Sequence, residues 1–163
     1  MSEDSKEVSP HQIHAFRRFL KLLPHGKDRA LVVLKAHLMI EEQIRQIVDE
    51  RLKNAEALRD ARLDCHQCIC LAQSFFSPEF QPWLWASLKK LNRIRNDIAH
   101  SVAPAGLQHR MDDFVKTYPS GDWGKADEVA RFELTLWSLF TSTCDLVETP
   151  SATIHQLTTG DDE

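Results

Sequence analysis

Glycine and long apolar runs are scarce in this chain, and each scarcity argues against a class of structure. Only five glycines and one tyrosine occur among the 163 residues. With so few glycines, and few runs of β-branched residues, the chain has little material for β-hairpins. No stretch approaches the roughly 18 apolar residues that indicate a membrane span. We therefore expect neither a β-sheet protein nor a membrane protein.

The first ten residues, MSEDSKEVSP, lack both the basic start and the apolar stretch of a secretory signal. A cytoplasmic protein is therefore expected. In that compartment the four cysteines, Cys65, Cys68, Cys70 and Cys144, should be free thiols rather than a disulfide framework.

The segment Cys65-His66-x-Cys68-x-Cys70 has the composition of a metal site. A structural zinc site usually needs two separated ligand pairs, however, and the chain has no second pair. The segment also has helical character, and free cysteines in a helix pack as small apolar side chains. We predict no metal ion and no cofactor, with metal binding by these cysteines left as the alternative. The other histidines show no metal-ligand spacing: His11, His14, His25, His37, His109 and His155.

The net charge of −4 comes from the two ends of the chain. Residues 1–7 contribute −2 and residues 161–163 contribute −3, which leaves +1 for the residues between them. Domains that bind nucleic acid are usually clearly basic, so the composition carries no strong nucleic-acid signature, although a local basic patch is still compatible with it. We expect a disordered acidic N-terminus at residues 1–9, one domain at residues 10–149 and a disordered acidic tail at residues 150–163.

Apolar residues recur at helical spacing through most of the chain, interrupted by proline and glycine. This pattern predicts an all-α fold, a single-domain antiparallel helical bundle of about five to six helices. The predicted helices cover about residues 11–23, 28–59, 63–76, 82–101, a short segment that begins near 107, and 125–148.

The helix predicted at residues 28–59 is expected at the centre of the bundle, because two apolar stripes run along it. Asp28 is a suitable residue to cap its start. The first stripe contains Leu31, Leu34, Leu38, Val48 and Leu52, and the second contains Val33, Ile40, Ile44 and Ile47.

An arginine interrupts the apolar stripe of the helix predicted at residues 82–101. At 100° per residue, Arg95 falls among the side chains that should face the core. Because an arginine cannot lose its charge, it must meet a carboxylate, extend to the surface, or face a groove where an anion binds. The apolar stripe itself consists of Leu84, Leu88, Leu91, Ile94 and Ile98.

Polar and positive residues lie close to Arg95 along the same helix. Asn92, Asn96 and His100 form a polar ribbon beside it. Four positive charges and no acid occur between Ser87 and Asn96, which suggests a place for phosphate groups. The candidate RNA- or phosphate-binding residues are Lys89, Lys90, Arg93 and Asn92. The alternative for the two lysines and Arg93 is an ordinary solvated face.

The segment Arg95-Asn96-Asp97-Ile98-Ala99-His100 resembles the R-x-x-x-x-H motif of the HEPN superfamily, whose members are all-α domains. The resemblance implies metal-independent RNA cleavage, in a homodimer whose two motifs face each other across one cleft. Arg95 would bind the phosphate and stabilise the charge that develops on it. His100 would act as general acid or base, and Asn96 would orient either of them. The products would carry 2′,3′-cyclic phosphate ends, and Glu41 or Glu42 would pair with Arg95.

Two functional hypotheses follow from this resemblance. The first is an endoribonuclease in a toxin–antitoxin or antiphage setting, with RNA as substrate and an antitoxin as partner. The second is a non-catalytic dimeric regulator or interaction module, because the helical layout also resembles the mannitol operon repressor-like members. Toxins paired with a minimal nucleotidyltransferase carry a tyrosine two residues after the histidine, whereas this chain has Val102 there, and its only tyrosine, Tyr118, is distant.

Each of these residues also has a purely structural interpretation. Arg95 can anchor its helix through an ion pair, and His100 can bond the last carbonyls of a helix end. Trp83 and Trp85 invite a base-stacking role, but tryptophans at a helix start more often pack into a core or a dimer contact, and we predict packing.

Overall fold

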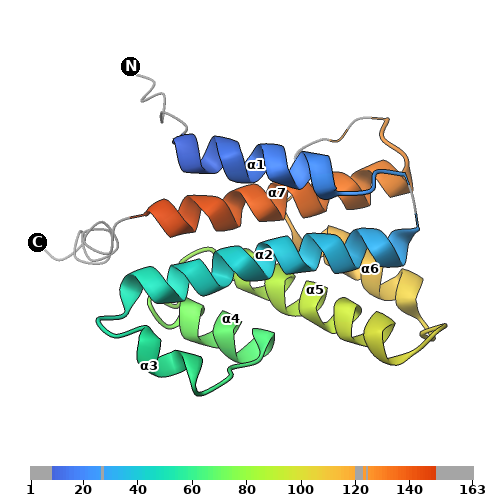
Figure 1. The fold of residues 1–163 in the computed structure, drawn as a ribbon. Helices are drawn as coiled ribbons and strands as arrows, with labels where there is room; N and C mark the ends of the chain where they lie inside the picture. Colours follow the sequence, from blue (N-terminus) through green and yellow to red (C-terminus); the bar gives the residue numbers. More distant parts are fainter. Residues whose placement is uncertain (1–8, 27, 120–122, 124, 150–163) are drawn as a thin grey trace, which may run out of the picture.

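The computed structural model describes residues 9–26, 28–119, 123 and 125–149. Over these residues the protein is all-α, as predicted (Figure 1). The helices are α1 (Pro10–Leu22), α2 (Arg29–Arg51), α3 (Glu56–Arg59), α4 (Cys65–Gln73), α5 (Pro82–His100), α6 (Leu107–Thr117) and α7 (Glu128–Glu148). The two predicted acidic ends lie outside the described residues, apart from Ser9, which caps α1. None of the described helices is long and apolar enough to cross a membrane.

Four helices begin at a side chain that accepts a hydrogen bond from a free backbone N–H of the first turn, which fixes the start of the helix. Asp28 caps α2, as predicted. Asp64 caps α4 in a reciprocal arrangement with Gln67, and this explains why α4 starts at Cys65 rather than near residue 63. The other two caps are Ser9 of α1 and Asp127 of α7.

The helix predicted at residues 28–59 is shorter in the structure, and the prediction of one continuous helix is wrong. Leu52 has extended backbone angles that end α2, and the one-turn helix α3 follows separately. The guanidinium of Arg51 donates hydrogen bonds to the carbonyl oxygens of Leu146 at 2.7 Å and Thr149 at 2.9 Å. These bonds join the end of α2 to the end of α7.

The helix α2 lies at the centre of the fold, as predicted, and contacts α1, α4, α5 and α7. The second predicted stripe is fully buried, with Val33 and Ile47 at 0% exposure. The first stripe is not: Leu31 is 42% exposed and Leu38 is 55% exposed. The first stripe is thus exposed at Leu31 and Leu38, while Val48 of the same stripe is 4% exposed.

The two helices α2 and α7 run in the same direction, which departs from the predicted antiparallel arrangement (Figure 1). Arg29 at the start of α2 pairs with Glu128 at the start of α7 at 3.0 Å. The end of α2 likewise bonds to the end of α7 through Arg51. Four helices lie between α2 and α7 in the sequence, and over them the chain returns to the end of the bundle where α2 begins.

The start of α5 packs through its tryptophans, as predicted. Trp85 is 1% exposed, and its Nε1–H donates to the carbonyl of Phe80 at 3.1 Å. The ring of Trp83 lies edge-on to Tyr118, with centroids 4.8 Å apart. These contacts position α5 so that its later turns pass α2 and α4.

Replacing Trp85 with alanine should remove about 3–5 kcal/mol from the free energy of unfolding, because a large buried side chain is deleted and a cavity remains. Urea denaturation followed by circular dichroism measures this quantity. The matched control is Val102→Ala, which shortens an exposed side chain and should change the free energy by less than about 0.5 kcal/mol. Equal losses in the two variants would contradict this description of the core.

Candidate functional site

A cleft of about 300 Å³ lies between α2, α4 and α5, and Arg95 and Asn96 of the predicted site line it. Its lining residues, apart from Cys65, have polar or charged side chains. The side chains that line it are His37, Glu41 and Arg45 from α2, Asp64, Cys65 and His66 at the start of α4, and Asn92, Arg95 and Asn96 from α5.

Arg95 is half-buried in this cleft and forms no ion pair with a described residue. Its Nη1 donates to Oδ1 of the neighbouring Asn96 at 3.0 Å. The predicted pairing with Glu41 or Glu42 is wrong, because both carboxylates have other partners. Glu41 pairs with Arg45 at 2.6 Å on its own helix, and Glu42 pairs with Arg18 of α1. Of the three predicted outcomes for Arg95, the structure corresponds to the third, an arginine that faces a groove.

His100 is the last residue of α5, and it is exposed and does not line the cleft. The structure thus brings Arg95 and Asn96 together and leaves His100 at the end of the same helix. That end is fixed to α6 by an ion pair between Asp97 and Arg110, with 2.8 Å between Oδ2 and Nε.

The predicted phosphate-binding residues point in different directions and do not form one strip. Lys89 donates to Gln73 of α4 at 2.8 Å, whereas Lys90 pairs with Asp113 of α6 at 2.6 Å. Arg93 is exposed. Asn92 is only 7% exposed, so it is part of the interior of the cleft rather than an outer contact for RNA.

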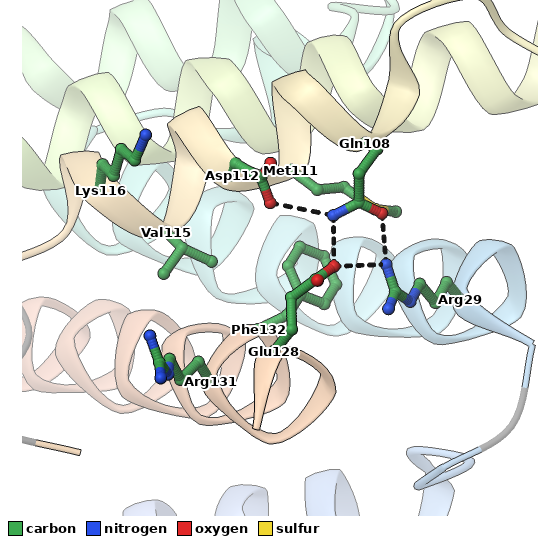
Figure 2. Close-up of a pocket in the computed structure, with 9 residues that line it drawn as sticks. All are labelled: Arg29, Gln108, Met111, Asp112, Val115, Lys116, Glu128, Arg131 and Phe132. Atoms are coloured by element: carbon green, nitrogen blue, oxygen red, sulfur yellow. Dashed lines mark hydrogen bonds and ion pairs between the residues drawn. The ribbon is translucent and has the colours of Figure 1, made fainter. Parts of the chain in front are cut away.

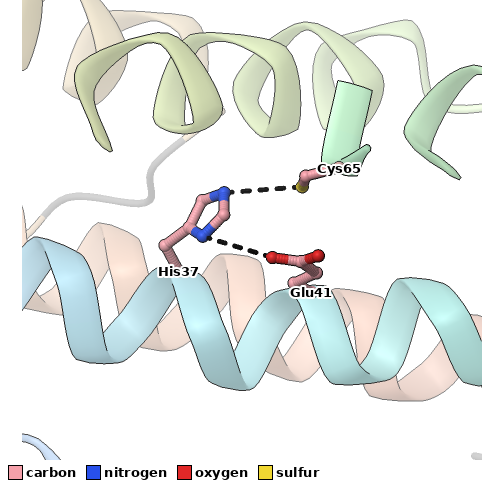
Figure 3. Close-up of side chains that lie close together, drawn as sticks. All are labelled: His37, Glu41 and Cys65. Atoms are coloured by element: carbon pink, nitrogen blue, oxygen red, sulfur yellow. Dashed lines mark hydrogen bonds and ion pairs between the residues drawn. The ribbon is translucent and has the colours of Figure 1, made fainter. Parts of the chain in front are cut away.

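The deepest polar group of the cleft is the ring of His37, which is 3% exposed. Its Nε2 lies 3.0 Å from Oδ1 of Asn92, and its Nδ1 lies 3.7 Å from Oε2 of Glu41 (Figure 3). Burial lowers the pKa of His37; the positive charge of Arg95 lowers it further, while the bond to Asn92 and the charge of Glu41 raise it. A ring with a lowered pKa is neutral at pH 7.

Cys65, the first residue of α4, faces the same ring, with 3.4 Å between its Sγ and Nε2 of His37 (Figure 3). Burial, reinforced by the charge of Glu41, raises the pKa of the Cys65 thiol to about 12. The thiol is therefore protonated at neutral pH and is not a resting nucleophile. One ligand atom each from His37, Glu41 and Cys65 lie within 4.8 Å of one another, close enough to hold a metal ion.

The other cysteines of the predicted metal segment do not join Cys65. Cys68 is buried in the core, and Cys70 is exposed on the same short helix. Cys68 thus packs as a small apolar side chain, as predicted. The residues that approach Cys65 come from α2, far away in the sequence.

A second cleft, of about 380 Å³, lies between α2, α6 and α7, and four of its polar side chains bind one another (Figure 2). Arg29 pairs with Glu128 at 3.0 Å and also donates to Gln108. Gln108 donates in turn to Asp112 at 2.9 Å. These bonds hold the three helices together, while Lys116 and Arg131, which also line the cleft, take no part in this network.

His37, the central side chain of the cleft, is not among the site residues predicted from the sequence. A signal was present: His37 is spaced three and seven residues from Ile40 and Ile44, so it falls on the buried stripe of α2. Arg95 stands out on α5 for the same reason, as a polar side chain within an apolar stripe. The pairing of His37 with Asn92 and Cys65 depends on three different helices, and helical periodicity does not predict it.

Native thiol labelling should distinguish the four cysteines by their exposure. A small alkylating reagent at pH 8 should modify Cys70 first, because it alone is exposed, whereas the buried thiol of Cys144 has a pKa raised to about 12. Mass spectrometry of the labelled protein gives the order. Cys70→Ser should remove the fast reaction, and Cys144→Ser should leave it unchanged; fast modification of Cys144 would contradict its burial.

Comparison with known proteins adds no name to this site: no protein family, no curated protein and no solved structure matches the chain. The function therefore has to be argued from the cleft itself, from the half-buried Arg95 and the polar side chains around it.

Proposed function

We propose that this protein is a metal-independent endoribonuclease of HEPN type in which Arg95 binds the scissile phosphate. The supporting observation is that Arg95 is half-buried in a polar cleft without an ion-pair partner among the described residues. A guanidinium that stays charged and lacks a carboxylate favours an anion at that place. A phosphate suits it well, since a guanidinium can donate two parallel hydrogen bonds to phosphate oxygens.

Asn96 and His100 supply the other two roles in this proposal. Oδ1 of Asn96 accepts from Arg95, which holds the guanidinium in one orientation. His100, exposed at the end of α5, takes the proton of the ribose 2′-hydroxyl as general base. The 2′-oxygen then attacks phosphorus, the bond to the 5′-oxygen breaks, and the 5′-oxygen takes a proton from water. A 2′,3′-cyclic phosphate end remains. Arg95 stabilises the negative charge that develops on the phosphate oxygens.

The proposal includes a homodimer, in which the His100 of one chain acts near the Arg95 of the other. Leu31 and Leu38 support it, because they are large apolar side chains, 42% and 55% exposed, one heptad apart on α2. The setting we propose is a cytoplasmic toxin or defence effector whose activity an antitoxin protein restrains.

RNA cleavage in the presence of EDTA tests this proposal. The wild-type protein should cleave RNA to products with 2′,3′-cyclic phosphate ends. His100→Ala should reduce the rate by about 10²–10⁴-fold, since it removes the general base. Arg95→Ala should reduce it by about 10²–10³-fold, since it removes charge stabilisation.

The matched controls for this assay are His109→Ala and Arg59→Ala, which remove an exposed histidine and an exposed arginine outside the cleft. Both should cleave at the wild-type rate. Intact RNA with the wild-type protein, or cleavage by His100→Ala at the wild-type rate, would refute the nuclease.

A second function, a non-catalytic dimeric regulator or interaction module, is favoured by one observation. His100 does not line the cleft that contains Arg95, so one chain does not assemble the three motif residues around a single point. In this alternative Arg95 binds an acidic group of a partner chain.

The two functions differ in what Arg95→Ala does. For the regulator, the variant should convert a dimer to a monomer in light scattering, while wild-type protein leaves RNA intact in EDTA. Arg93→Ala, which removes a neighbouring exposed charge, should remain dimeric. An Arg95→Ala variant that stays dimeric would count against the regulator.

A further inference from the structure

The base of the Arg95 cleft contains a buried nitrogen without a hydrogen-bond partner. The ring of His37 has a carbonyl oxygen, Oδ1 of Asn92, 3.0 Å from Nε2, so the ring N–H lies on Nε2 and donates to it. Nδ1 then carries the lone pair. It is buried, and none of the described residues donates a hydrogen bond to it. An unsatisfied buried acceptor is costly, and this one faces into the cleft.

A carboxylate oxygen faces this lone pair. Oε2 of Glu41 lies 3.7 Å from Nδ1 of His37, which is too long for a hydrogen bond. The other oxygen, Oε1, is held by Arg45, with 2.6 Å to Nη2 and 3.0 Å to Nε. Two electron-rich atoms thus face each other in a buried place, an arrangement that a cation between them would stabilise.

The spacing and the third side chain suit a metal ion. Metal–nitrogen and metal–oxygen bonds of about 2.0–2.2 Å for zinc span a separation of 3.7 Å when the ion lies between the two atoms. Sγ of Cys65 lies beside the same ring, and one ligand atom from each of the three residues falls within 4.8 Å of the others (Figure 3). Sγ of Cys65 lies 3.4 Å from Nε2 of His37, so binding at Nδ1 requires the Cys65 side chain to change rotamer.

We propose that His37, Glu41 and Cys65 bind a divalent transition-metal ion of the zinc type, through Nδ1, Oε2 and Sγ, with the fourth position open to the cleft. Binding releases the thiol proton of Cys65 to solvent and forms the metal–thiolate bond. The bond from Nε2 of His37 to Asn92 is the outer contact that a metal-bound histidine needs to fix its ring. The ion would join α2 to α4.

The charges around the site are consistent with this ion. A divalent cation bound to one thiolate and one carboxylate forms a group with no net charge. The positive charge of Arg95 therefore remains available to an anion in the cleft. None of Arg95, Asn96 and His100 is a ligand. The metal site therefore goes beyond the proposed cleavage and does not depend on it.

Direct titration with Zn²⁺ and Co²⁺ tests the site in the full-length protein, stripped with a chelator and assayed without RNA. The wild-type protein should bind one equivalent of Zn²⁺, and bound Co²⁺ should show a thiolate-to-metal charge-transfer absorption. Cys65→Ser and Glu41→Gln should each weaken Zn²⁺ binding by at least about ten-fold, and Cys65→Ser should abolish the charge-transfer band. Asn92→Ala, which removes the outer contact, should weaken binding by about 10–100-fold.

Cys70→Ser is the matched control, because Cys70 lies on the same helix, is exposed, and has only His66 near it, at 3.7 Å. It should bind Zn²⁺ as the wild type does. The proposal fails if the wild type binds no equivalent of Zn²⁺, if Cys65→Ser binds as tightly as the wild type, or if Cys70→Ser abolishes binding instead. Circular dichroism of each variant accompanies the titration to show that it is folded. The two ligand variants, Cys65→Ser and Glu41→Gln, each change one side chain and leave the buried His37 in place.

Discussion

The burial of α2 against four other helices is the constraint on which the rest of this structure depends. A helix contacted by α1, α4, α5 and α7 exposes few of its side chains, so its polar groups must find partners inside the protein. Gln43 does so by accepting from the Cys144 thiol at 3.5 Å, and Arg51 does so through the last carbonyls of α7. His37 does so through Asn92, and that contact creates the base of the polar cleft.

The cleft differs from the other polar contacts of the protein in how its charges are distributed. In the cleft bounded by α6 and α7, Arg29 and Glu128 neutralise each other. In the cleft at Arg95, the one nearby carboxylate of α2, Glu41, is already paired with Arg45. Arg95 is left with an amide as its only described hydrogen-bond partner. The charged side chains that line this cleft are two of each sign, Arg45 and Arg95 against Glu41 and Asp64, but Arg95 has no ion-pair partner among the described residues. The carboxylate, thiol and imidazole at the base of the cleft form a separate group, at which we propose a metal ion.

The sequence predicted most of the helices because their signals are local. Pro82 and the apolar stripe from Leu84 to Ile94 placed α5, and Asp28 marked the start of α2. The end of α2 was not predictable in this way, since Arg51 and Leu52 respond to the carbonyls of α7, about 95 residues later in the sequence. The exposure of Leu31 and Leu38 has the same origin: spacing shows which residues share a face, but not whether a neighbour covers that face.

For the site, the sequence alone determined that α5 carries an arginine on its inward side, because a side chain's direction follows from the helical repeat. It also placed Asn96 beside that arginine and His100 at the end of the helix. Only the tertiary structure decided what Arg95 meets there. The crossing of α2, α4 and α5 brings His37, Glu41 and Cys65 close together. The two acids predicted to pair with Arg95 pair with other arginines instead, Glu41 with Arg45 and Glu42 with Arg18. Pairing between distant segments depends on how helices pack, and that is a property of the whole chain rather than of any one stretch of it.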